Sequence, residues 1–246
     1  MKRFLMIIGL LSLVMGQSAD SLFQLGNKYY SAEQYQKAAN IYEQLSRRVA
    51  HEDLYLNLGN SYFRMGQMGN AIWAYEKGNA LSPRDSDINY NLKFVRSQIR
   101  DRILPPDDFF LVAFYRAIVE KLTISDLITL GGLILMLLGL LYVLQLQSVF
   151  TEKLASIVNG TLLLSIFATG WIMLDKYWDV SDQQKAIVIV RAVDVRSGPV
   201  TRGENVVFQI HEGTKAEITT TQTGWYEVIL LDGKKGWVPA SQMRLL

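Results

Sequence analysis

Cysteine is absent from this sequence of 246 residues. Its absence excludes disulfide bonds, thiolate nucleophiles, thiolate metal ligands and a lipid anchor attached through cysteine. The cellular compartment stays open, because an oxidising compartment permits disulfide bonds without requiring them.

The sequence also has only a small excess of positive over negative charge, and few histidines. The 25 Lys and Arg residues and the 23 Asp and Glu residues leave a net charge of +2, which implies no nucleic-acid partner. The two histidines, His51 and His211, have no partner at a metal-ligand spacing, and His211 is expected in a turn. We therefore expect no catalytic residues, no metal and no cofactor, and hence a protein that is not an enzyme.

The N-terminus has the layout of a secretory signal peptide. Two basic residues precede an apolar run over 4–15, and small and polar residues follow it. The run is too short to cross the hydrocarbon of a bilayer comfortably. We predict a signal peptide over 1–19, cleaved near Gly16 or Ala19. The alternative is an uncut anchor, which leaves the following domain on the same side of the membrane.

Residues 20–101 repeat themselves at an offset of 33 positions. A period of this length with helical patterning predicts stacked helix-turn-helix units. The small residues at repeated positions let the helices approach closely, and the tyrosines fill the space between them. The repeated pairs are Leu25/Leu58, Gly26/Gly59, Asn27/Asn60, Tyr29/Tyr62, Gln34/Gln67, Ala38/Ala71, Tyr42/Tyr75 and Glu43/Glu76.

These positions resemble the signature of tetratricopeptide repeats, as two units followed by a capping helix over 85–100. Gly78 departs from the family pattern, and the first unit lacks the closing proline that Pro83 supplies in the second. The remaining signature positions are filled by Leu22, Leu25, Gly26, Tyr29, Ala38, Tyr42 and Leu45 in the first unit and by Tyr55, Leu58, Gly59, Tyr62, Ala71 and Tyr75 in the second.

The resemblance implies a concave groove lined by the first helix of each unit. Asn27 and Asn60 are suited to hold a peptide backbone there, because an amide group both donates and accepts hydrogen bonds. The alternative is a solvated helix face. The expected groove residues are Phe23, Asn27, Tyr30, Leu56, Asn60, Phe63 and Arg64.

Two long apolar stretches, Leu127–Leu146 and Leu154–Leu174, predict a transmembrane hairpin over 125–176. Each stretch has about twenty residues, which is enough to cross a bilayer at 1.5 Å per residue. The connection between them is too short for a domain, so the two outer ends emerge on one side. Asn159 in the second stretch is expected to form a hydrogen bond with the first helix.

A linker over 102–124 precedes the hairpin. Pro105 and Pro106 interrupt the helical pattern, and residues 109–122 then mix apolar and aromatic side chains with charged ones such as Arg116. This composition predicts an amphipathic segment in the membrane interface. The alternative is a helix packed beneath the repeat domain.

Residues 185–246 predict a small all-β barrel, so the fold class is multi-domain: helical repeats, a two-helix transmembrane hairpin and a barrel. Asp232 and Gly233 predict a two-residue hairpin turn, because both residues tolerate positive φ. Runs of β-branched and aromatic residues predict strands at 186–190, 206–210, 215–221 and 225–231.

Four segments of this region resemble a bacterial SH3-type domain in order and spacing: 195–199, 211–214, 224–228 and 236–239. Three aromatic residues, Trp225, Tyr226 and Trp237, are candidates for a ligand surface on this SH3-like barrel. The alternative is a packing role, because barrel cores need such residues, and at least one tryptophan is expected in the core.

The order of the four regions resembles that of BatE-type proteins of the bacterial Bat aerotolerance operons. The resemblance implies a bacterial inner-membrane protein with both soluble domains in the periplasm. It also implies that the protein is found with von Willebrand factor A-type membrane proteins and a MoxR-type ATPase, in an envelope complex linked to oxidative-stress tolerance.

We expect a scaffold that holds two binding modules in a thin layer on one membrane face. That restriction raises the effective concentration of the modules for proteins of the inner membrane and periplasm. One alternative is a protein that binds or senses peptidoglycan through the barrel. The other is an accessory of transport or catalysis in which Asn159 has a direct role.

Overall fold

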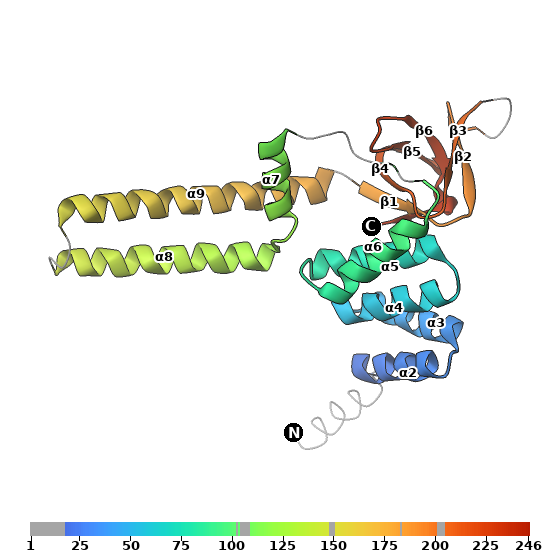
Figure 1. Cartoon of the computed structure of the whole chain (residues 1–246), viewed down its shortest axis with the longest axis horizontal. Helices are drawn as coiled ribbons and strands as arrows, with labels where there is room; N and C mark the ends of the chain where they lie inside the picture. Colours follow the sequence, from blue (N-terminus) through green and yellow to red (C-terminus); the bar gives the residue numbers. More distant parts are fainter. Residues whose placement is uncertain (1–17, 102, 104–108, 148–150, 183, 201–204) are drawn as a thin grey trace, which may run out of the picture.

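The protein is described here from a computed structural model. The structure describes residues 18–246 apart from 102, 104–108, 148–150, 183 and 201–204. All but the last two residues of the predicted signal peptide lie outside the described residues, as do Pro105 and Pro106. The remaining chain forms a helical stack, a long helical hairpin and a sheet (Figure 1).

The helical stack contains five antiparallel helices in chain order. Their bounds are α2 (Ala19–Ser31), α3 (Tyr35–Ser46), α4 (Glu52–Arg64), α5 (Met68–Leu81) and α6 (Ser86–Gln98). Three of them begin at side chains that accept hydrogen bonds from the first turn, which satisfies amide groups that have no partner inside the helix. These capping residues are Ser18, His51 and Asp85.

The repeat predicted from the sequence is confirmed at the level of contacts. The ring of Tyr42 packs on Gly26, and 33 residues later the ring of Tyr75 packs on Gly59. A Cβ atom would lie 2.9 Å from Tyr42 Cδ1 at the first glycine and 2.6 Å from Tyr75 Cδ1 at the second. Only glycine therefore lets the two helices of each unit come this close.

One position breaks this equivalence between the units. Glu33, in the turn between α2 and α3, has a φ of 58°, whereas the position 33 residues later is Gly66, with a φ of 73°. A Cβ in this left-handed conformation costs about 1–2 kcal/mol, and glycine avoids that cost while losing about 0.5–1 kcal/mol of chain entropy on folding.

Replacing Glu33 with Gly is therefore expected to raise the free energy of unfolding by about 0.5–1 kcal/mol. The reciprocal change, Gly66→Glu, is expected to lower it by a similar amount. Urea denaturation of the detergent-solubilised full chain, followed by far-UV circular dichroism, measures both. A loss of stability in Glu33→Gly would contradict the strain assigned to this turn.

The hairpin consists of α8 (Ile124–Leu146) and α9 (Glu152–Asp182), with the shorter α7 (Phe110–Val119) at its base. Residues Ile124–Leu146 and Glu152–Trp178 have mean hydropathies of 2.6 and 1.8, yet only 11% and 6% of their most apolar windows are buried. Helices that are this apolar and this exposed do not form the core of a soluble domain. Their length and composition suit a membrane span.

Side-chain hydrogen bonds of α9 run largely along the helix itself. Thr161, Ser165 and Thr169 each donate to the carbonyl oxygen four residues earlier, at 2.8–3.0 Å. The hydrogen bond predicted between Asn159 and α8 is not present among the described residues. The prediction was wrong because the amide of Asn159, which is half-buried, need not point at the other helix.

The C-terminal sheet is antiparallel and has the strand order β3-β2-β6-β5-β4-β1-β7. Together with the helices it confirms the predicted fold class. The sequence predicted no strand at the positions of β2 and of the three-residue β7. The bounds are β1 (Gln184–Val188), β2 (Ala192–Arg196), β3 (Val206–His211), β4 (Lys215–Gln222), β5 (Trp225–Ile229), β6 (Lys235–Pro239) and β7 (Met243–Leu245).

The connection between β5 and β6 differs from the two-residue turn that was predicted. Leu230 N donates to Lys234 O at 2.9 Å, and Gly233 N donates to Leu230 O at 2.9 Å. Three residues therefore form the loop, and of these only Gly233 has positive φ, at 83°. This is the hairpin loop in which one glycine closes a tight turn as a bulge.

The interior of the barrel is aliphatic. Trp225 and Trp237 are half-exposed and belong to neither hydrophobic core, so the prediction of a core tryptophan was wrong. Methyl-bearing side chains fill an interior this small and leave no room for an indole ring. The core residues are Ala186, Val188, Val193, Val195, Ile210, Ala216, Ile218, Val228, Leu230, Val238 and Met243.

Candidate interaction surfaces

The barrel packs directly on the helical stack, along α5. The indole nitrogen of Trp73 donates to Leu245 O at 2.6 Å, and Gly69 N donates to Glu212 Oε1 at 2.9 Å. Ile187 of β1 is fully buried as a member of the hydrophobic core of the stack. Core packing and hydrogen bonds thus both join the two domains.

Arg244 of β7 is the centre of this contact. Its guanidinium lies over the ring of Trp73, 3.4 Å from the centroid, and forms an ion pair with Glu43 at 2.6 Å. It also donates to the Tyr62 hydroxyl and to Asn70 Oδ1, each at 3.2 Å. Burial, together with the hydrogen bond that Tyr62 donates to Glu43, raises the pKa of Tyr62 to about 12.

A buried carboxylate provides a second link. Glu76 of α5 has 10% of its side chain exposed and lies between Lys215 of the barrel, at 3.0 Å, and Arg96 of α6. Burial acts to raise the pKa of Glu76, but the two cations outweigh it and hold the pKa below its ordinary value. The carboxylate is therefore charged in the folded protein at neutral pH.

A third link follows the end of α6. Asp101 accepts hydrogen bonds from His211 N at 2.6 Å and Thr214 Oγ1 at 2.9 Å, and its second oxygen lies 2.9 Å from His211 Nδ1. Burial acts to raise the pKa of Asp101, but these hydrogen bonds lower it. His211, expected in a turn, is the last residue of β3, where its ring serves this contact.

These three links mean that the repeats and the barrel form one packed unit, which we call the repeat–barrel unit. The sequence did not predict this direct contact between the two expected binding modules. Their surfaces are held in a fixed relation to each other, and a partner meets both as parts of one body.

The predicted groove residues lie on the face formed by α2, α4 and α6, which we call the first-helix face. Arg64 is exposed, and its guanidinium lies 4.9 Å from the centroid of the Tyr35 ring, whose edge meets Tyr30 at 5.3 Å. The other predicted residues, Phe23, Asn27, Tyr30, Leu56, Asn60 and Phe63, are half-buried.

The amide oxygen of Asn27 holds the stack together. It accepts hydrogen bonds from the Tyr42 hydroxyl at 2.7 Å and from Asn57 Nδ2 at 3.1 Å. Both of its lone pairs are thus used within the fold. Burial also raises the pKa of Tyr42 above its ordinary value, so that hydroxyl stays a donor.

Asn60 repeats this arrangement one unit later. Its oxygen accepts from the Tyr75 hydroxyl at 2.7 Å and from Asn91 Nδ2 at 3.0 Å. Each asparagine was predicted to offer a peptide both a donor and an acceptor. Because its oxygen is already used within the fold, it can offer only the donors of its NH₂ group. A ladder of tyrosine and asparagine instead joins each unit to the next helix.

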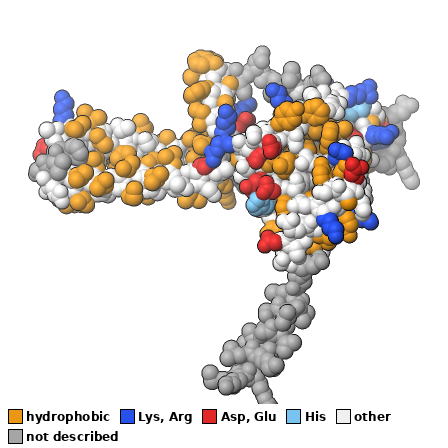
Figure 2. Space-filling view, turned by 60° about the horizontal axis from the view of Figure 1, so that its bottom comes forward, with side chains coloured by type: hydrophobic (Ala, Val, Ile, Leu, Met, Phe, Trp, Pro, Cys, Tyr) orange, Lys and Arg blue, Asp and Glu red, His pale blue; other side chains and the backbone are white. Residues whose placement is uncertain are grey.

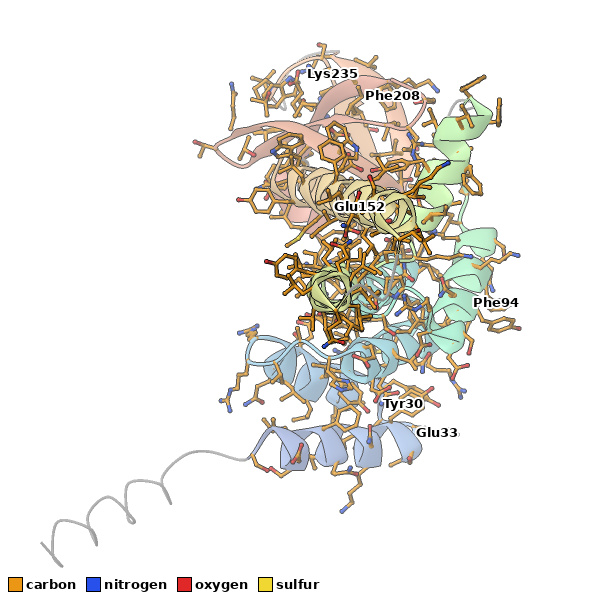
Figure 3. The ribbon with its side chains drawn as sticks, turned by 90° about the vertical axis from the view of Figure 1, so that its left-hand side faces the viewer. Tyr30, Glu33, Phe94, Glu152, Phe208 and Lys235 are labelled. Atoms are coloured by element: carbon orange, nitrogen blue, oxygen red, sulfur yellow. The ribbon has the colours of Figure 1, made fainter. Side chains whose placement is uncertain are left out.

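Two exposed aromatic side chains that were not among the predicted groove residues lie on α6. Tyr90 and Phe94 are 69% and 44% exposed and stack with 6.3 Å between ring centroids. Phe94 also meets Phe63 edge-on at 5.8 Å, so α6 continues the predicted surface, and Figure 3 shows Phe94 on the same side of the stack as Tyr30. The available signal was two aromatics four residues apart, off the packing face of an amphipathic helix.

The barrel divides its three candidate aromatics between two sides. Strand pairing sets Glu227 opposite Trp237 and Trp225 opposite Pro239, so the two tryptophans share the outer face. Tyr226 points the other way and packs on the barrel core. The outer face continues into an open pocket of about 670 Å³, lined by Trp225 and the residues Pro199, Thr221, Gln222, Thr223 and Gly224.

The junction between the two domains leaves a further cleft of about 480 Å³, with apolar walls that include Ile72 and Ile99. Its charged lining includes Glu76 and Asp101, whose carboxylates are already engaged in the links described above. We therefore assign this cleft to the packing of the two domains.

Comparison with known protein families matches residues 191–243 to the bacterial SH3 domain. The C-terminal region is thus of the SH3 class, and the match covers the barrel alone. A search of the curated proteins found no match.

Several solved structures resemble parts of the chain. The crystal structure of PcrH in complex with the chaperone binding region of PopD is 14% identical and covers 64% of this chain and 96% of its own, with a TM-score of 0.32. The Yersinia enterocolitica type III secretion translocator chaperone SycD is 17% identical and covers 66% of this chain and 97% of its own, with a TM-score of 0.32. The C-terminal SH3 domain of myosin IB from Entamoeba histolytica is 17% identical and covers 27% of this chain and 89% of its own, with a TM-score of 0.20. At TM-scores this low, the likeness says nothing of what this chain binds.

Proposed function

We propose that this chain is a membrane-anchored adaptor without enzymatic activity, in which the hairpin holds the repeat–barrel unit at a membrane surface. The observation that supports the proposal is that an exposed apolar hairpin is attached to a unit with exposed aromatic side chains. The first-helix face would bind a peptide segment of a partner protein, with aromatic rings contacting its apolar side chains.

The attachment of the repeats to the hairpin supports this arrangement. Arg84, in the turn after α5, donates to both carboxylate oxygens of Asp126 at 2.8 and 3.1 Å, and to Lys121 O at 3.1 Å. Asp126 is in the first turn of α8 and forms a capping box with Thr123. A two-pronged contact between arginine and carboxylate has a defined geometry, so it orients the repeats relative to the hairpin.

The finer parts of the proposal concern the compartment and the complex. A signal peptide before α2 would place both soluble domains in the periplasm, and a hairpin keeps them on one side. Partners would then be proteins of the bacterial inner membrane and periplasm, including other Bat-type proteins of an envelope complex linked to oxidative-stress tolerance.

Topology can be tested with cysteines, because the chain contains none. Lys28→Cys and Lys234→Cys place single thiols on exposed positions of the repeats and the barrel. In intact cells, a membrane-impermeant maleimide is expected to label both. If one of the two positions were accessible to the reagent only from the cytoplasmic side, the hairpin topology would be overturned.

The binding surface is tested by the double change Tyr90→Ser and Phe94→Ser. We expect it to weaken binding of the partner protein about 10–30-fold, because each ring lost from an interface costs on the order of 1 kcal/mol. Both side chains are exposed, so the free energy of unfolding should change by less than about 1 kcal/mol.

A photo-reactive amino acid at position 90 captures and identifies that partner in living cells, and titration of the purified pair then gives the affinity. The matched control carries the same group at Gln44, an exposed position on α3. Equal capture at both positions, or equal affinity of the double variant, would rule out the first-helix face.

A second candidate function is peptidoglycan binding by the barrel, favoured by the shared outer face of Trp225 and Trp237 beside an open pocket. Aromatic rings pack on sugar faces, as they do on other flat apolar surfaces. The detergent-solubilised full chain would then sediment with insoluble peptidoglycan, and Trp225→Ala with Trp237→Ala would abolish sedimentation. Failure of the unaltered chain to sediment removes this candidate.

A further inference from the structure

Helix α7 lies across the base of the hairpin, with its axis steeply inclined to α8 and α9 (Figure 1). It is attached to α9 by Tyr115, whose hydroxyl donates to Asp175 Oδ2 at 2.9 Å. This contact joins α7 to the hairpin, so it favours the predicted interfacial position over the alternative beneath the repeat domain.

The surface of α7 away from α9 has two different sides. Phe110, Leu111, Phe114 and Ile118 fall on one side at helical spacing and are 68%, 56%, 66% and 43% exposed. Arg116 and Glu120, one turn apart, lie on another side, away from Phe114. An apolar side this exposed requires an apolar environment, and Figure 2 shows it continuing the hydrophobic surface of the hairpin.

The position of α7 along the hairpin points to lipid as that environment. Trp171, Tyr177 and Trp178, at the same end of α9, are 55%, 64% and 50% exposed, and such aromatics concentrate where a bilayer meets water. Near the opposite end, Tyr142 of α8 is 63% exposed. At a rise of 1.5 Å per residue, Ile124 and Tyr142 lie about 27 Å apart along the helix, close to the thickness of bilayer hydrocarbon.

We infer that α7 lies in the plane of the membrane interface, with Phe110, Leu111, Phe114 and Ile118 in contact with phospholipid. The inference rests on the proposed membrane anchoring and adds a function to this helix. Arg84 binds the carbonyl oxygen of Lys121, in the turn between α7 and α8, as well as Asp126. Because the same arginine contacts both the turn that follows α7 and the first turn of α8, the position of α7 in the interface sets the height and tilt of the repeat–barrel unit above the lipid.

The test uses single cysteines carrying a nitroxide spin label, in the full chain reconstituted into nanodiscs of phosphatidylcholine and phosphatidylglycerol. Labels at Phe114→Cys and Glu120→Cys sample two sides of α7, and labels at Leu164→Cys and Glu33→Cys serve as references for lipid and water. Collision with oxygen reports lipid, and collision with a water-soluble nickel complex reports solvent. We expect position 114 to resemble position 164, and position 120 to resemble position 33.

Each other outcome has a defined meaning. If position 114 resembles position 33 while position 164 still reports lipid, the hairpin spans the membrane but α7 does not touch it, and the inference fails. If position 114 is shielded from both reagents, protein covers this side, and the inference fails as well. If position 164 reports water, the membrane anchoring in the proposed function fails first.

Discussion

Replacing Arg244 with Ala is expected to separate the barrel from the helical stack and to lower the free energy of unfolding by about 3 kcal/mol. The change removes the cation over Trp73 and leaves Glu43 without its cationic partner at the junction. A guanidinium on an indole face contributes about 0.5–2 kcal/mol, and removing one partner of a desolvated ion pair costs several more. With 24% and 28% of the Arg244 and Glu43 side chains exposed, solvent reduces that second cost.

Hydrogen exchange of the full chain measures this separation directly. Amides of β7 and α5 should exchange faster in Arg244→Ala, whereas those inside β5 should change little. Arg244→Lys keeps the charge but not the flat stacking group, so it should restore only part of the stability. Lys234→Ala, which removes an exposed ion pair with Asp232, is the matched control. Unchanged exchange in β7 would contradict a central position for Arg244.

Acid should act on the same junction. Glu76 and Asp101 have pKa values below their ordinary ones in the folded protein. Their contribution to stability is therefore complete above the ordinary carboxylate range, near pH 4, and is lost as the pH falls through the lowered values. The difference in exchange between Arg244→Ala and the unaltered chain should shrink over that range.

Replacing Gly59 with Ala is expected to lower the free energy of unfolding by about 2 kcal/mol, although alanine is the better helix former by about 1 kcal/mol. A Cβ at this position lies 2.6 Å from Cδ1 of Tyr75, a ring that is 1% exposed. The ring cannot move aside, because its hydroxyl is bonded to Asn60. Overpacking of this kind typically costs 1–3 kcal/mol, and a contact this short belongs at or above the upper end.

Two further variants separate overpacking from any other effect of the alanine. Tyr75→Leu shortens the obstructing side chain, so Gly59→Ala should cost much less in its presence; a double-mutant cycle measures the difference. Gly139→Ala places its Cβ in open space and should change stability by less than about 0.5 kcal/mol. Thermal unfolding followed by circular dichroism serves for all of these variants. Equal losses for Gly59→Ala with and without Tyr75 would contradict the contact.

The predicted asparagine contacts show which features of the site a repeat pattern in the sequence reveals and which it does not. The offset of 33 correctly placed Asn27 and Asn60 on equivalent positions of the first-helix face. It did not reveal that a tyrosine from the same unit and an asparagine from the next helix use both lone pairs of each oxygen. Such hydrogen bonds depend on side-chain directions between helices, which a repeat period does not contain. The groove itself stays a prediction.

The class of each region followed from local pattern, because periodicity, glycine spacing and apolar length act over short stretches of chain. The helical repeat, the two long apolar helices and most of the SH3-type strands were predictable for this reason. The docking of the barrel on α5 was not, since Arg244 and Trp73 are 171 positions apart and neither has a partner nearby in sequence. The exposed aromatic side of α6 likewise became visible only once its packing partners were placed, because the sequence does not show which side of a helix another element covers.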